Sequence, residues 1–178
     1  MKRFIVVSGL PASGKTTVGA AVASALGLPL LDKDVILETL FARDGIGDHS
    51  WRSRLSRIAD DLLQSRALAS QGAVISSWWR HPLSTLGSGA TVDWLTTLDG
   101  DVVELHCQCR PSTAVERFFA RQRHAGHLDE MKSRELEFTK FQQFAVHGAL
   151  GLHRVVELDT EHPLDLVALL CALEPSAK

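Results

Sequence analysis

Residues 9–16 read Gly-Leu-Pro-Ala-Ser-Gly-Lys-Thr, which matches the spacing G-x-x-x-x-G-K-[ST] of a phosphate-binding loop. Glycines at both ends of the motif let the backbone turn tightly enough to aim several N–H groups at one polyphosphate. Lys15 is expected to reach the β- and γ-phosphates, and the Thr16 hydroxyl to join the ligands of a magnesium ion. The motif therefore predicts nucleotide binding. The residues assigned to the nucleotide here are Gly9, Ala12, Ser13, Gly14, Lys15, Thr16 and Thr17.

The residues on either side of the loop supply the elements that such a loop needs. Residues 4–7, Phe-Ile-Val-Val, form a short apolar run typical of a buried strand. Residues 18–26 carry apolar side chains at helical spacing, and the pattern stops at Gly27. A helix that begins behind the loop turns the positive end of its dipole toward a bound anion. The order strand, loop, helix makes a glycine-rich turn that binds nothing the weaker interpretation.

Length and composition limit the kind of protein. The chain has 178 residues, 45% of them hydrophobic, which suits a single globular domain over residues 1–178. A formal net charge of −2 gives no electrostatic reason to expect nucleic acid or a membrane as partner, so a small molecule is expected. Three cysteines do not make a disulfide framework and suit a cytoplasmic location. The oligomeric state stays open.

Alternating apolar runs and helical patterns follow the first helix. Because helices separate the strands, the pattern predicts an α/β fold: a five-stranded parallel sheet with right-handed crossovers and helices on both faces. Ser50 is expected to cap the long third helix. The further strands are expected at 28–31, 73–76, 101–109 and 154–158. The further helices are expected at 35–41, 51–71, 92–98, 112–121, 131–146 and 163–173.

Polar side chains follow the second and third predicted strands. Asp32 and Asp34 come directly after the second, at the sheet edge where open α/β proteins keep their ligands. Trp78, Trp79 and Arg80 follow the third and are expected to line a substrate pocket. Core packing explains the two tryptophans equally well, and Arg80 less easily.

Arginines gather in two further places. Arg117, Arg121 and Arg123 lie on or just beyond the helix 112–121, where they could cover a triphosphate, although a favourable interaction with the helix dipole is an alternative. The stretch 121–127 is polar, contains glycine and could serve as a mobile flap. The arginines of helix 51–71, among them Arg52, are interpreted as a solvated face, with one of them reaching a substrate as the alternative. Cysteines 107 and 109 with histidines 124 and 127 form a weak metal-site alternative to buried thiols and loop histidines.

These motifs together resemble the small P-loop kinases of the nucleoside-monophosphate-kinase fold, in the style of shikimate kinase, gluconate kinase and chloramphenicol phosphotransferase. The resemblance rests on the phosphate-binding loop and on the stretches 31–34, 76–80 and 116–127, in that order along nearly the whole chain. It implies sheet order 2-3-1-4-5 and a lid over about residues 121–131. The third strand departs from the pattern, because many relatives carry an Asp or two glycines where this chain has two serines and two tryptophans, and this leaves the acceptor open.

The resemblance also implies roles for single residues. Arg117 matches an arginine that stacks on adenine, and Arg121 and Arg123 match lid arginines on the phosphates. Asp32 matches the carboxylate that holds magnesium, and Asp34 the one that meets the acceptor hydroxyl, although these two roles could be exchanged. With Lys15, Asp34 and the two lid arginines are the expected catalytic residues, while Asp34, Trp78, Trp79 and Arg80 are the expected acceptor contacts.

The function expected from this pattern is transfer of phosphate from ATP, with Mg²⁺, to a hydroxyl of a small metabolite or an antibiotic. A nucleoside or nucleotide kinase is the first alternative. A nucleotide-binding switch with slow hydrolysis is the second, although the sequence holds no guanine-selective Asn-Lys-x-Asp motif and no obvious switch glutamine. A polynucleotide kinase is disfavoured by the near-neutral charge.

Overall fold

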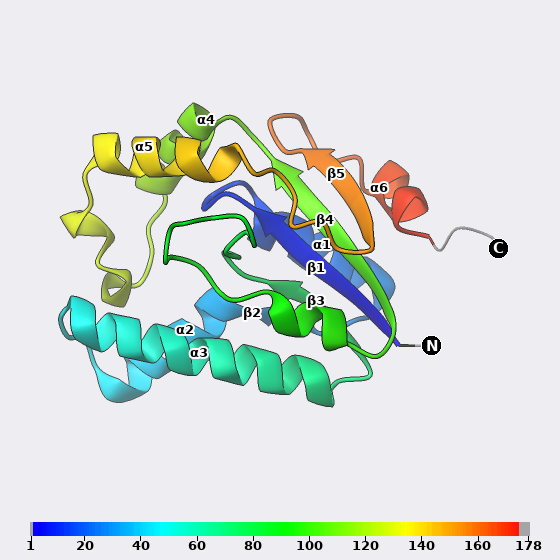
Figure 1. Cartoon of the computed structure of the whole chain (residues 1–178), viewed down its shortest axis with the longest axis horizontal. Coiled ribbons are helices and arrows are strands. Elements are labelled where there is room, and N and C mark those ends of the chain that lie inside the picture. The colour runs from blue at the N-terminus through cyan, green and yellow to red at the C-terminus, as the bar shows by residue number, and fades with distance from the viewer. Residues whose placement is uncertain (1, 175–178) are drawn as a thin grey trace.

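The computed structural model describes residues 2–174, along which strands and helices alternate (Figure 1). The expected elements are present, with ends that shift by a few residues. The strands are β1 (Arg3–Gly9), β2 (Leu30–Asp32), β3 (Gly72–Ser76), β4 (Asp101–Gln108) and β5 (Arg154–Asp159). The α-helices are α1 (Lys15–Leu26), α2 (Lys33–Asp44), α3 (His49–Ala69), α4 (Pro111–Ala120), α5 (Arg134–Ala145) and α6 (Leu166–Leu173). The 3₁₀ turns are η1 (Asp93–Thr97), η2 (Ala125–His127) and η3 (Asp129–Met131).

In the described part of the chain the strands form one five-stranded sheet in the order β2-β3-β1-β4-β5, and every pair is parallel. The predicted fold class and strand order are therefore confirmed. β1 is central, between β3 and β4, and Val7 pairs with Ser76 on one side and with Leu105 on the other. Because the strands run in one direction, their carboxyl ends meet at a single edge of the sheet, where the phosphate-binding loop follows β1.

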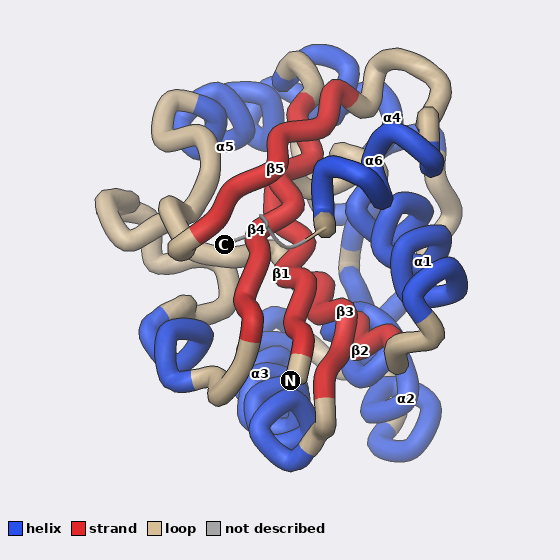
Figure 2. The backbone as a smooth tube through the Cα atoms, turned by 90° about the vertical axis from the view of Figure 1, so that its right-hand side faces the viewer, coloured by secondary structure: helices blue, strands red, loops and turns tan. Residues whose placement is uncertain are grey.

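Each face of the sheet buries its own apolar core. On one face, Ile5 and Val7 of β1 pack with residues of α1 and α6, two helices that lie beside each other in Figure 2. On the other face, Phe4 and Val6 pack with residues of α2, α3 and η1. Successive side chains of a strand point to opposite faces, so this alternation makes β1 hydrophobic throughout. A third cluster joins α4 and α5 above the first residues of the phosphate-binding loop.

Two helix starts differ from the sequence-based expectation. The cap of α3 is Asp48, whose carboxylate accepts a hydrogen bond from the Trp51 backbone N–H at 2.8 Å, so the assignment of the cap to Ser50 is wrong. α2 begins at Lys33, with Asp32 as its cap, so Asp34 lies in the first helical turn and not in a loop. Within residues 2–174, none of the helices combines the length and the apolar character that crossing a membrane requires.

Candidate functional site

The loop between β1 and α1 has a backbone that only certain residues permit. Gly9 and Gly14 adopt positive φ angles of 125° and 93°. A Cβ at residue 9 would lie 2.2 Å from the Cys107 carbonyl oxygen, so glycine alone fits there. Ala12 also has a positive φ, of 60°, a strained conformation that occurs mostly at functional sites. The backbone of this loop is thus conformationally strained at Ala12, which is typical of a loop that binds a ligand.

Lys15 is folded back onto this loop. Its Nζ donates hydrogen bonds to the carbonyl oxygens of Gly9 at 3.0 Å and Leu10 at 2.5 Å. Burial lowers the pKa of Lys15 to about 8, against smaller opposing effects of nearby acidic groups that include Asp34. The ammonium group is therefore held ready beside the loop, with backbone partners that a phosphate could replace.

Asp32 and Thr16 bring two oxygen ligands together at the sheet edge. The Thr16 hydroxyl donates to Asp32 Oδ2 at 3.1 Å, and Asp32 Oδ1 accepts from the Asp34 backbone N–H at 2.8 Å. Burial, followed by the neighbouring charge of Asp34, raises the pKa of Asp32. A buried carboxylate beside a hydroxyl is the donor set that a hard cation such as Mg²⁺ prefers. These two residues therefore fit a magnesium ion that also binds nucleotide phosphates.

Asp34 faces the segment between α4 and α5. Its Oδ2 accepts a hydrogen bond from Arg123 Nη2 at 2.5 Å. Burial raises the pKa of Asp34, but the positive charges of Arg123, His127, Arg121 and Lys15 outweigh it, so the net pKa is lowered. Asp34 is thus held in the ionised form that accepts a proton, and the same cations keep it a weak base until they are drawn to another anion.

The segment between α4 and α5 rests on one face of α2. Asp34, Glu38 and Phe41 follow each other at helical spacing, and Glu38 Oε1 lies 2.9 Å from His127 Nε2. Phe41 stacks on His124, with ring centroids 5.3 Å apart, and meets the His127 ring edge-on. We call residues 121–133 the lid segment. Three positions on one face of α2 therefore hold this segment against the helix.

A cavity of about 710 Å³ lies between the phosphate-binding loop, α2 and the lid segment. Its lining includes seven Lys and Arg against five Asp and Glu side chains, an excess of positive charge that suits a polyanion. The basic residues are Lys15, Arg52, Arg117, Arg121, Arg123, Lys132 and Lys140. At one end, Arg117 donates to the Thr160 carbonyl oxygen at 2.8 Å, close to the loop after β5. The walls thus hold most of the residues that the sequence assigns to the nucleotide.

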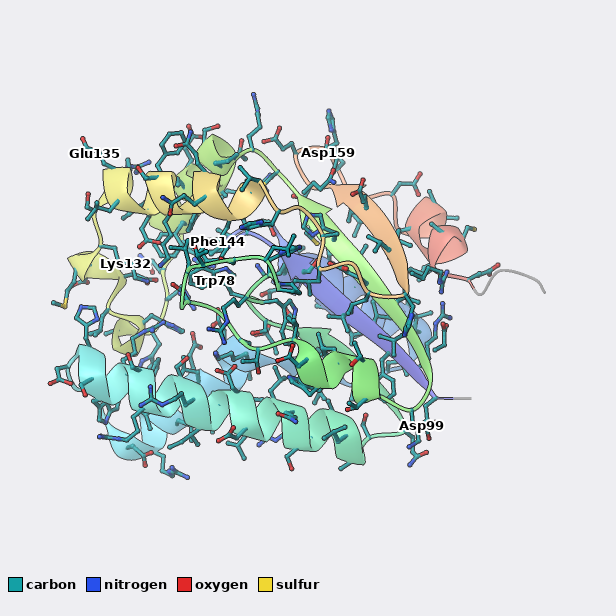
Figure 3. The ribbon with its side chains drawn as sticks, in the orientation of Figure 1. Trp78, Asp99, Lys132, Glu135, Phe144 and Asp159 are labelled. Carbon is teal, nitrogen blue, oxygen red and sulfur yellow. The ribbon has the colours of Figure 1, made fainter. Side chains whose placement is uncertain are left out.

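The other end of the cavity combines charge with an aromatic surface. Lys140 of α5 lies over the Trp78 ring, 4.6 Å from its centroid, and Trp78 packs edge-on against Phe144. Figure 3 shows Trp78 and Phe144 together beneath α5, whereas Glu135 lies on the outer side of that helix. Arg52 of α3 also lines the cavity, and its buried Nε has no hydrogen-bond partner among the described residues. An unpartnered buried guanidinium nitrogen is costly, so this group has a donor free for a ligand in the cavity.

Two expected acceptor contacts are placed elsewhere. Trp79 is buried, donates from Nε1 to the Val7 carbonyl oxygen at 2.9 Å and packs against Trp94, so it belongs to the core and lies outside the lining of this cavity. Arg80 is absent from the cavity lining and contributes instead to the charges around Asp60. Trp78 alone of the three lines the cavity.

Most of the other residues expected at the nucleotide line this cavity. They are Ala12, Gly14, Thr16 and Thr17. Ser13 does not line it and is buried, with a hydroxyl that has no hydrogen-bond partner among the described residues. Gly9 lines a second, smaller cavity. Among residues 2–174 no group of three or more His, Cys, Asp and Glu could hold a metal ion, so the cysteine and histidine alternative is wrong.

The sequence analysis overlooked several lining residues. Of the four arginines in α3, residues 54, 57 and 66 are exposed as expected, but Arg52 enters the cavity. Glu38 lies one helical turn after Asp34, and this spacing alone could have placed the two carboxylates on the same face. Lys132 lies in a loop and Lys140 in a helix, and both segments carry many polar residues. The sequence pattern therefore does not distinguish these two lysines from ordinary surface lysines.

Comparisons with known proteins agree with this arrangement. A family model described as AAA_33, AAA domain, matches residues 4–143. A shikimate kinase of Mycobacterium tuberculosis is 39% identical over 79 residues, which are 40% of this chain and 41% of that protein. Another, from Mycobacterium marinum, is 34% identical over 108 residues, 55% of this chain and 50% of that one. The chain thus spans about half or less of the length of these curated relatives.

Solved structures match over almost the whole chain. A protein of Chloroflexus aurantiacus described as a candidate kinase has a TM-score of 0.76 and 27% identity, over 96% of this chain and 95% of that one. A gluconokinase of Sinorhizobium meliloti, at 20% identity, has a TM-score of 0.55 over 96% and 88% of the two chains. A shikimate kinase of Bacteroides thetaiotaomicron, at 17% identity, has a TM-score of 0.57 over 96% and 93%. The last two support the fold alone.

Proposed function

Because the chain belongs to the AAA_33 family of AAA domains, we propose that it is a phosphotransferase that uses ATP and Mg²⁺ to phosphorylate a hydroxyl of a small molecule carrying an anionic group. The observation that carries the proposal is one cavity that holds both a phosphate-binding loop and an ionised carboxylate, Asp34, beneath cationic side chains. Phosphoryl transfer needs positioning and charge stabilisation more than covalent chemistry from the protein.

Phosphate binding, magnesium binding and acceptance of the hydroxyl proton are each assigned to residues of the cavity. The backbone of the phosphate-binding loop and Lys15 bind the nucleotide phosphates. Arg117, which lines the cavity beside the loop after β5, contacts the nucleotide base in this proposal. Thr16 and Asp32 would hold the magnesium ion, which supplies charge neutralisation on the phosphate oxygens. Asp34 orients the acceptor hydroxyl and takes its proton.

The lid arginines complete the charge balance during transfer. Arg123 is bound to Asp34 in this structure, and Arg121 lies over the Phe118 ring, 4.8 Å from its centroid. Both line the same cavity, so a rotation of either side chain brings its guanidinium group to a nucleotide phosphate. We propose that phosphate binding draws Arg123 away from Asp34 and so frees the carboxylate for the acceptor.

We infer that the acceptor carries an anionic group from the basic side chains at the end of the cavity near Trp78. Arg52 and Lys140 come from different helices and line the same space. Lys140 Nζ lies 3.8 Å from Glu137 Oε1, whereas Arg52 makes no ion pair within residues 2–174. The acidic side chains in the surroundings of Arg52 are Asp129, Asp34 and Glu137. The Trp78 ring supplies a flat apolar surface next to Lys140. A hydroxylated acid with a ring or carbon chain, such as a sugar acid or a cyclic hydroxy acid, matches these features. The shikimate kinases and the gluconokinase among the relatives fit this class by name.

The test is ADP release from Mg²⁺-ATP in the presence of separate pools of sugar acids, cyclic hydroxy acids, neutral sugars, nucleosides and nucleoside monophosphates. A Lys15→Ala variant serves as the control. We expect an acid pool to raise the release well above background in the native protein and not in the variant. Stimulation by nucleosides or their monophosphates would replace the proposal with a nucleoside or nucleotide kinase. ATP binding without stimulation by any pool would favour a nucleotide-binding switch.

A further inference from the structure

A second cavity lies behind the wall formed by Trp78 and Phe144. Its volume is about 390 Å³, and it opens between β4, the segment after β3 and the loop between α5 and β5. Its walls include Leu10, Leu150 and the ring of His106. Of the roles described above, none uses this space.

A buried carboxylate organises one wall of this cavity. Glu104 of β4 is fully buried, and its Oε2 accepts from the backbone N–H groups of Gly151 at 3.0 Å and Leu152 at 3.3 Å. Its Oε1 accepts from the Leu150 N–H at 2.7 Å and lies 2.5 Å from Ser8 Oγ. With the Ser8 hydroxyl as a fourth donor, Glu104 is the acceptor in each of these hydrogen bonds.

The hydrogen bonds of Glu104 determine the hydrogens on the next two residues. Ser8 donates its hydroxyl hydrogen to Glu104 Oε1, so its oxygen can only accept from other groups. Ser8 Oγ lies 2.8 Å from His106 Nδ1, and it can only accept there, so His106 carries a hydrogen on Nδ1. Burial lowers the pKa of His106 despite the opposing charge of Glu104, so the ring is neutral at physiological pH. The lone pair of a neutral His106 is therefore on Nε2.

That lone pair makes no hydrogen bond within residues 2–174, and Nε2 is not among the fully buried unpartnered atoms, so this nitrogen of the 11% exposed side chain is accessible to an occupant of the cavity. His81, on another wall of the cavity, is different. Its Nδ1 accepts from the Leu83 N–H at 3.1 Å, so its Nε2 donates to the Ala149 carbonyl oxygen at 3.0 Å. His81 is satisfied, and His106 offers one directed acceptor to whatever occupies the cavity.

We propose that this second cavity is a ligand site for a small planar aromatic molecule that donates one ring N–H hydrogen bond to His106 Nε2. The aromatic walls, Trp78 and Phe144, favour a flat ring, and the acceptor at the end of a Glu–Ser–His chain favours an N–H donor. Leu10 and the carbonyl-lined start of the phosphate-binding loop close the same space, so an occupant would lie beside the partners of Lys15.

The probes are indole, which has a ring N–H, and 1-methylindole, which has the same ring and no donor. Binding to the isotope-labelled full chain is followed by the ¹⁵N resonances of the histidine rings at pH 7.5. We expect the free protein to show His106 with hydrogen on Nδ1. Indole should shift the His106 Nε2 resonance and bind at least tenfold more tightly than 1-methylindole.

Two variants keep the proposal open to refutation. Ser8→Ala removes the acceptor of His106 Nδ1, so we expect the ring to change tautomer and the preference for indole to disappear. His106→Phe should bind both probes equally, whereas His49→Phe, at an exposed position, should behave as the native chain. Thermal unfolding shows which variants fold. Equal binding of the two probes to the native protein, a His106 ring with hydrogen on Nε2, or no indole binding at millimolar concentration would each overturn the proposal, whatever the outcome of the ADP-release assay.

Discussion

Arg123 and Asp34 form an ion pair across the cavity, with Nη2 and Oδ2 2.5 Å apart, although 89 positions separate them along the chain. Arg123 also donates from Nη1 to Asp129 at 3.2 Å, within the lid segment itself. One guanidinium group thus ties the carboxylate expected to act on the acceptor to the segment expected to cover the nucleotide. This pair links binding of phosphate to exposure of the base.

The role of Asp34 predicts a separation of catalysis from nucleotide binding. Asp34→Asn keeps the shape of the side chain but loses the proton acceptor, so we expect turnover to fall by about 10²–10⁴-fold. The affinity for Mg²⁺-ATP, measured by calorimetry, should not fall, because the substitution weakens the ion pair that holds Arg123 away from the phosphates. Asp44→Asn, at the exposed end of the same helix, is the matched control. Native turnover in Asp34→Asn would remove Asp34 from the catalytic residues.

Nucleotide affinity should depend on pH through Lys15. Burial lowers the pKa of this ammonium group to about 8, so the group loses its positive charge as the pH rises through that value. The charge of Mg²⁺-ATP stays the same over this range. Between pH 7 and pH 9 we expect the affinity for Mg²⁺-ATP to fall by up to about tenfold. Lys15→Arg keeps its charge over this range, so its affinity, even if weaker, should stay constant. An equally steep pH dependence in Lys15→Arg would assign the effect to another group.

Gly126 tests whether the lid segment must dock on α2. A Cβ at this position would lie 2.5 Å from the ring of Phe41, which is buried and packed on Trp51. Gly126→Ala should therefore displace the lid segment, cost about 1–3 kcal/mol of unfolding free energy and lower turnover at least tenfold. Gly87→Ala, where a Cβ meets nothing within 4 Å, is the control. Turnover and thermal unfolding measured together separate the two effects, and an unchanged turnover would show that docking is dispensable.

Arg52 should determine the affinity for the acceptor. Loss of a hydrogen bond between charged groups costs about 1.5–3 kcal/mol, so Arg52→Gln should raise the KM for an anionic acceptor about 10–100-fold. The KM for ATP should not change. Arg54→Gln, two positions along α3 and exposed, should resemble the native protein. Equal effects of the two substitutions on steady-state kinetics would indicate a general electrostatic effect and no direct contact.

Local patterns allowed much of the fold to be predicted. The phosphate-binding loop is a continuous motif, and each buried strand is an apolar run, so their order along the chain was enough to identify a parallel sheet. The positions of Asp32 and Asp34 followed from the rule that the carboxyl ends of parallel strands share an edge. The order of the strands within the sheet required the family resemblance, because pairing depends on contacts between distant segments.

Contacts between distant segments also explain the errors. Trp79 was expected at the acceptor, but its indole N–H finds the Val7 carbonyl oxygen of a neighbouring strand, which no local pattern reveals. Asp48 and Ser50 are both good capping residues two positions apart, and only the backbone decides between them. Glu104 and His106 alternate with apolar residues along β4, and their burial depends on distant segments: residues 150–152 donate to Glu104, and Ser8 lies between the two side chains.

The central place of β1 has a consequence for the synthesis of the chain. Its two neighbours, β3 and β4, begin about 70 and 100 residues later, so the strand that carries the phosphate-binding loop lacks its second partner until more than half of the protein has left the ribosome. Until then the emerging segment exposes one of the most apolar stretches of the chain. We expect folding to be limited by these distant pairings and release of the native protein to depend on protection of this first strand.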